Sequence, residues 1–91
     1  MYEISKDFIC RTVCGETMLM PVGEKTKEFN GIFTLTETGA IVIDEIKKGG
    51  NELSAAKRIA EEFEIDPETA KNDTLAFIGQ LLKYGIIEKQ K

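Results

Sequence analysis

The spacing of hydrophobic and polar positions changes once along the chain, near position 36. Before it, short β-rich runs are separated by polar turns, and after it apolar positions recur at helical spacing. The first part predicts three strands, over residues 8–14, 17–22 and 29–35. Gly15-Glu16 favours a two-residue type II′ hairpin between the first two strands. The polar run "GEKTKEFNG", with a glycine at each end, is typical of a loop.

Three helices follow, each with a start signal of its own. The N-terminal signals are Thr36 for the first helix, Asn51 or Ser54 for the second, and Asp66 followed by Pro67 for the third. Lys47 and Lys48 fall in the last turn of the first helix, and the second is expected over residues 52–63. The third runs to Tyr84, and Gly85 after it fits a left-handed cap.

The order of these elements is β-β-β-α-α-α, which predicts an α+β fold. We expect a three-stranded antiparallel sheet followed by a three-helix bundle, winged helix-turn-helix-like, in a single domain over residues 1–91. Gly39, inside the first helical turn, costs about 1 kcal/mol relative to Ala. We interpret it as a position that permits a close backbone approach.

Composition narrows the class of protein. The chain has 91 residues, 42% of them hydrophobic and 31% charged, as in an ordinary soluble globular protein. No apolar run is long enough to span a membrane and the N-terminus lacks a secretory pattern, so a cytoplasmic location is expected. The net charge is −4 and no region of the chain is strongly basic, so the electrostatic attraction that drives DNA binding is weak.

Catalytic and metal chemistry are hard to assemble from these residues. The chain has no histidine, so the commonest general base is missing. Cys10 and Cys14 lack the further ligands that a zinc site needs, and on one strand they lie too far apart for a disulfide. We interpret both as reduced, partly buried thiols. No enzyme activity, metal or cofactor is expected.

The third predicted helix has an unusually wide apolar stripe, covering about half of its circumference. Its centre consists of Ala70, Thr74, Ile78 and Leu81, with Leu75 and Leu82 on one side and Phe77 and Tyr84 on the other. Either the sheet covers the excess, or one side forms the wall of an exposed groove. A winged-helix DNA-binding regulator is the alternative, but Asp66, Glu68 and Asp73 would face phosphates.

Four segments in order resemble the family of the pyrroloquinoline quinone biosynthesis protein D. They are "FICRTVCGETMLMPVG", "GIFTLTETGAIVIDEI", "AAKRIAEEF" and "NDTLAFIGQLLKYGII", which together span residues 8–87. Two positions depart from the family's pattern: Thr36 stands where Asn is common, and Thr74 where Val is common.

The resemblance implies a non-catalytic recognition module for ribosomally made, modified peptides. Such a module binds the leader of a precursor peptide and presents it to a modifying enzyme, often a radical S-adenosylmethionine maturase. The leader adds as a strand to the edge of the third strand and lies beside the third helix. Carried onto this chain, the resemblance implies these peptide-binding residues: Phe29, Gly31, Ile32, Phe33, Thr34, Leu35, Asp73, Phe77, Gln80 and Tyr84.

Two questions stay open at the level of the sequence. Leu75 and Leu82 are the alternative groove wall, and Phe77 has an equally good interpretation as a core residue. Self-association of edge strands into a homodimer is a further alternative. The expected test of strand addition is Phe33→Pro, which weakens binding if the Phe33 amide faces the open edge.

Overall fold

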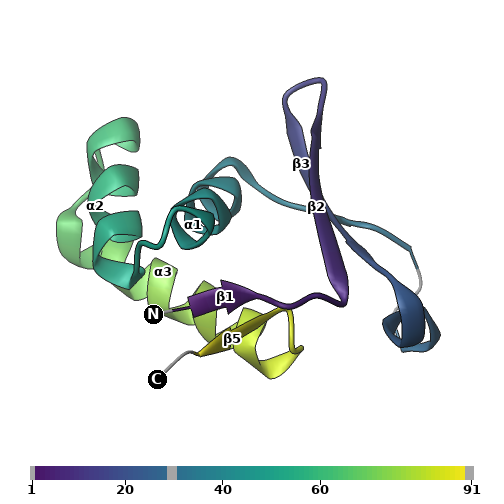
Figure 1. The fold of residues 1–91 in the computed structure, drawn as a ribbon. Helices are drawn as coiled ribbons and strands as arrows, with labels where there is room; N and C mark the ends of the chain where they lie inside the picture. Colours follow the sequence, from purple (N-terminus) through teal and green to yellow (C-terminus); the bar gives the residue numbers. More distant parts are fainter. Residues whose placement is uncertain (1, 29–30, 90–91) are drawn as a thin grey trace.

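The computed structural model of the chain describes residues 2–28 and 31–89. Its elements are β1 (Tyr2–Ile4), β2 (Phe8–Val13), β3 (Glu16–Pro21), the 3-10 helix η1 (Gly23–Lys27), β4 (Phe33–Thr34), α1 (Glu37–Lys47), α2 (Glu52–Phe63), α3 (Pro67–Lys83) and β5 (Ile87–Lys89). Strands β2, β3 and β4 form an antiparallel sheet in that order. Figure 1 shows the β2–β3 hairpin extending away from the three helices. The predicted α+β class is confirmed.

The three helices begin where the capping residues predict. Thr36 Oγ1 accepts a hydrogen bond from the Gly39 amide at 3.1 Å. Asn51 and Ser54 share the second start in a capping box, in which each side chain accepts a bond from the other residue's backbone. Asp66 caps α3 with Pro67 at its first position. These signals are local, so the helix positions follow directly from short segments of sequence.

The hairpin turn differs from the prediction by one residue. Val13 pairs with Glu16, so the two turn residues are Cys14 and Gly15. Both have positive φ, +52° and +80°, as a type I′ turn requires, and a type II′ turn at Gly15-Glu16 is wrong. The twist of a type I′ turn matches that of the strands, which offsets the strain at a non-glycine residue. Cys14 is therefore exposed, so its predicted partial burial is wrong, whereas Cys10 is half-buried as predicted; both are free thiols.

The third strand of the sheet is much shorter than predicted. Strand β4 covers Phe33–Thr34 rather than residues 29–35. Gly31 has a φ of +94°, which is incompatible with a regular strand, and the Thr36 cap ends the extended segment on the other side. Part of the expected loop before it forms η1. Phe29 lies outside the described residues.

A second sheet, which the sequence patterns did not predict, joins the two ends of the described chain. Tyr2 pairs with Lys89 and Ile4 with Ile87 in an antiparallel ladder of β1 and β5 (Figure 1). Gly85 adopts the expected left-handed cap at φ +72°, and the Ile86 amide donates to Leu81 O. The chain then continues as a strand, because β1 lies beside it and satisfies its backbone groups.

The core is built between the helices and one face of the sheet. Its buried members are Phe8, Leu19, Ile41, Val42, Ile43, Ile46, Ala55, Ala56, Ile59, Ala70, Ile78, Leu81, Ile86 and Ile87. Leu19 on the central strand is fully buried, and its cross-strand neighbours Cys10 and Phe33 share its face of the sheet. No helix within the described residues is long and apolar enough to cross a membrane.

Candidate functional site

The outer edge of β4 presents backbone groups that β3 does not use. The Leu35 amide donates to Thr17 O at 2.8 Å, in register with the Phe33–Leu19 pair two residues earlier. The backbone N–H and C=O groups of successive residues in an antiparallel strand point to opposite edges. Those of Phe33 therefore point toward β3, and those of Thr34 point away from it. Within the part of the chain that the structure describes, no strand pairs with this outer side.

This alternation corrects the expected test of strand addition. The Phe33 amide faces β3 rather than the open edge, so Phe33→Pro would disturb the sheet itself. Thr34, exposed on the next position, carries the outward amide and carbonyl. The neighbouring Ile32 has 55% of its surface exposed. An added strand would therefore bond to Thr34 and lie next to an exposed apolar side chain.

Strand β4 leads directly to a close contact between α1 and α3. A methyl group placed on Gly39 would lie 3.2 Å from Cζ of Phe77 and 3.6 Å from Cβ of Leu35. Gly39 is thus a position of close contact, as predicted, but the group nearest to it is the Phe77 ring rather than another stretch of backbone. Leu35 and Phe77 are both partly buried against the core. The open edge of the sheet and the side of α3 that carries Phe77 therefore meet at the first turn of α1.

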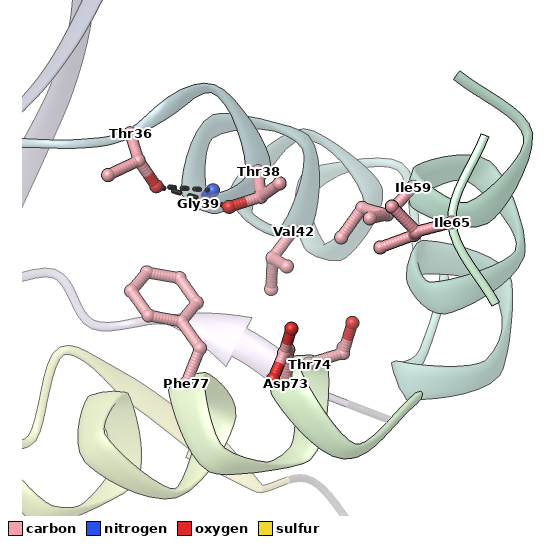
Figure 2. A pocket seen from close by; sticks show the side chains of 9 residues that line it. All are labelled: Thr36, Thr38, Gly39, Val42, Ile59, Ile65, Asp73, Thr74 and Phe77. Atoms are coloured by element: carbon pink, nitrogen blue, oxygen red, sulfur yellow. Dashed lines mark hydrogen bonds between the residues drawn. The ribbon is translucent and has the colours of Figure 1, made fainter. Parts of the chain in front are cut away.

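A pocket of about 100 Å³ opens at this junction, between α1, α3 and the end of α2 (Figure 2). It is lined by Thr36, Thr38, Gly39, Val42, Ile59, Ile65, Asp73, Thr74 and Phe77. The walls are mostly apolar, and Asp73 is the one residue of the lining with a formal charge. Figure 2 shows the side-chain oxygens of Asp73 and Thr74 on the side of α3 that faces α1.

The residues predicted for α3 divide between the pocket and the surface beyond it. Asp73 and Phe77 line the pocket, and Gln80 and Tyr84 are exposed farther along the same side of the helix. The alternative wall consists of Leu75 and Leu82, which are 43% and 37% exposed and do not line this pocket. The structure thus brings the β4 segment together with the Asp73–Phe77 side of α3. The binding role of these residues stays a prediction.

Comparison with known proteins identifies the family. The family model for coenzyme PQQ synthesis protein D (PqqD) matches residues 16–87, which is more than half of the chain. The chain belongs to the PqqD family. No curated protein matches it.

Two solved structures resemble this PqqD-family chain over nearly its whole length. One is described as lasso peptide synthetase B1 complexed with the leader peptide; it is 16% identical with a TM-score of 0.81, and the match covers 97% of this chain and 98% of that one. The other is TbiB1 in complex with the TbiA(beta) leader peptide, 18% identical with a TM-score of 0.80 and 98% coverage of both chains. At these identities the likeness establishes a shared fold.

Sequence patterns missed several residues that shape the pocket of this PqqD-family chain. Beyond their departure from the family's pattern, Thr36 was recognised as a cap and Thr74 as part of the apolar stripe on the third helix, and neither was assigned to a pocket. Thr74 is 1% exposed, and its hydroxyl makes no hydrogen bond to any described residue. A polar residue at the centre of an apolar stripe, between Ala70 and Ile78, was the available signal.

The resolved pKa shifts near α1 lie away from the pocket. Arg58 Nη1 on α2 contacts Asp44 Oδ2 at 2.7 Å and Glu45 Oε2 at 2.9 Å on α1. Hydrogen bonds from Arg58 lower the pKa values of both carboxyl groups, and the same bonds raise the pKa of Arg58. These contacts join α1 to α2 and stabilise the packing of the two helices. Among residues 2–28 and 31–89, no group of three or more Cys, Asp or Glu side chains is placed to hold a metal ion.

Proposed function

We propose that this PqqD-family chain is a non-catalytic, single-domain module that binds the leader of a ribosomally made precursor peptide. The leader adds as a strand along β4, with its backbone bonded to Thr34 and its side chains beside the Phe77 side of α3. Strand addition supplies affinity through backbone bonds and specificity through pockets for alternate side chains. The binding residues proposed are Phe29, Gly31, Ile32, Phe33, Thr34 and Leu35, together with Asp73, Phe77, Gln80 and Tyr84 on α3.

One observation carries this proposal: the outward edge at Thr34 lies two residues before Thr36, which lines the pocket at the first turn of α1. Family membership and the fold support it, because both similar structures are described as complexes with leader peptides. The DNA-binding alternative has less support, since Glu68 and Asp73 are both exposed on α3 and would repel phosphates.

The proposed partners include an enzyme as well as a peptide. The module presents the bound leader to a modifying enzyme in the cytoplasm, and a radical S-adenosylmethionine maturase is the proposed one. Self-association through a free sheet edge would give a homodimer that competes with strand addition. Light scattering with and without leader distinguishes the two, because a competing homodimer dissociates when the leader binds.

The test is a titration of the isotopically labelled chain with the leader of the precursor peptide encoded beside it. Amide resonances of residues 31–35 and of the Asp73–Tyr84 side of α3 are expected to shift most. The pairing of backbone groups also predicts slowed hydrogen exchange of the Thr34 amide in the complex. Shifts confined to α2 or to the β1–β5 sheet would contradict the proposal.

A further inference from the structure

The pocket at the first turn of α1 has a buried polar group that finds no hydrogen-bond partner among residues 2–28 and 31–89. Thr74 is 1% exposed, and its Oγ1 makes no hydrogen bond within the described residues. An unpaired buried hydroxyl lowers stability, and Val has nearly the same shape without that cost. Packing of the core therefore does not account for a hydroxyl at this position.

The volume of the pocket limits what can enter it. It measures about 100 Å³, whereas an apolar protein cavity of about 150 Å³ binds benzene. The pocket is therefore too small to enclose an aromatic ring, whereas a side chain of about four heavy atoms fits inside it. Val42, Ile59 and Ile65 supply apolar walls for its carbon atoms.

The polar groups of the lining limit the chemistry of the occupant. The Asp73 carboxylate accepts hydrogen bonds and repels another anion, so it disfavours a carboxylate side chain. The Thr74 hydroxyl both donates and accepts. A threonine in a helix uses two χ1 rotamers, so rotation exchanges its Oγ1 and Cγ2 and can turn the hydroxyl toward an occupant that reaches the floor.

We propose that this pocket selects one short side chain of the bound peptide that carries a hydroxyl or a primary amide: Thr, Ser or Asn. Its polar end donates to Asp73 and accepts from Thr74, while its carbon atoms contact the apolar walls. This inference rests on the proposed peptide binding and adds the specificity of one subsite. Thr74 is then a residue that determines specificity.

The test is selection of peptides from a displayed library of random 12-residue sequences on the full chain and on its Thr74→Val and Thr74→Ser variants. Peptides bound to the unmodified chain and to Thr74→Ser are expected to share Thr, Ser or Asn at one aligned position. Those bound to Thr74→Val are expected to carry Val or Ala there. In a selected peptide, Thr→Val at that position should weaken binding about 3- to 10-fold with the unmodified chain and less than about twofold with Thr74→Val.

Two further measurements separate this inference from the proposed function. Thr74→Val should raise the thermal midpoint of the protein while it lowers the affinity for the peptides selected by the unmodified chain. If Thr74 had only a structural role, the thermal midpoint and the affinity would change in the same direction. If all three proteins select the same apolar, aromatic or basic side chain, the subsite is wrong. The proposed strand addition still holds in that case, provided that Thr34→Pro abolishes binding of the same peptides. If the selected peptides bind the Thr34→Pro variant as tightly as the unmodified chain, both the subsite and the strand addition are wrong. The same conclusion follows if the selection yields no peptides.

Discussion

The three-stranded sheet has two outer edges, on β2 and on β4, and they differ in length and in surroundings. Strand β2 has six residues and β4 has two. The Val22 amide donates to Asp7 O, and by alternation Thr12 on β2 faces away from β3, as Thr34 does on β4. Length alone would favour β2 as the edge for a guest strand.

Surroundings favour the other edge. Strand β4 leads through Leu35 and Thr36 into the pocket formed by α1 and α3, whereas no β2 residue lines that pocket. A free edge supplies backbone bonds that any extended peptide can make, and neighbouring side chains decide which peptide binds. Under the proposed function, the pocket beside β4 makes that edge the recognition site, and the length of the edge matters less.

The largest effect is expected from a matched pair of proline substitutions at the two edges. Thr34→Pro removes the outward amide of β4, and its ring obstructs the guest strand, so leader affinity should fall at least about tenfold. Thr12→Pro makes the same change on β2, at another exposed threonine with an outward amide, and should alter affinity less than about twofold. Isothermal titration calorimetry with the leader measures both.

Folding of the two variants provides the control for this comparison. Proline is tolerated where a strand's amide points away from its neighbour, so both proteins should keep the unmodified circular dichroism spectrum. Phe33→Pro, by contrast, should lower the thermal midpoint because its amide faces β3. If Thr12→Pro abolishes leader binding and Thr34→Pro does not, β2 is the binding edge and the proposed site is wrong.

A smaller effect is expected from the two sides of α3. Tyr84→Ala removes a half-exposed ring on the side that continues from Phe77, and should lower leader affinity about 3- to 10-fold. Leu82→Ala removes a side chain of comparable exposure on the opposite side and should change affinity less than about twofold. Neither truncation empties a buried site, so thermal midpoints should stay close to that of the unmodified chain. The reverse order of affinities would move the groove to the Leu75–Leu82 side.

The contrast between local and distant signals explains what could be predicted from the sequence. Thr36, Asn51 and Asp66 act on backbone amides two or three residues away, so short segments determine where the helices begin. The β1–β5 ladder pairs Tyr2 with Lys89, and nothing within either short strand specifies so distant a partner. The length of β4 was overestimated because Gly31 adopts a positive φ that its hydrophobic neighbours did not reveal.

The part of the candidate site that lies on one helix could be predicted, and the parts contributed by other helices could not. Spacing along one helix grouped Asp73 with Phe77, and the structure places both in the pocket. The other walls come from α1 and from residues near the end of α2, and their meeting depends on how the helices pack. Gly39 was the exception, because a glycine in a helical turn signals a close contact even when its partner, Phe77, is unknown.

The smallest effect on binding is expected at a site distant from both edges, the Arg58 contacts with Asp44 and Glu45. Arg58→Gln should change leader affinity at pH 7 less than about twofold, yet lower stability by about 1 kcal/mol or less, since these side chains are partly exposed and screened. The folded pKa values of both carboxyl groups are lowered, so their stabilising contribution is present above the ordinary values of 3.8 and 4.5 and is lost as the pH falls through the folded values. Thermal unfolding between pH 6 and about pH 2 should therefore show a steeper acid loss for the unmodified chain than for Arg58→Gln. Arg11→Gln, at an exposed arginine on β2, is the matched control and should keep the steeper profile. An equal acid loss in all three proteins would show that other carboxyl groups control the acid stability of the bundle.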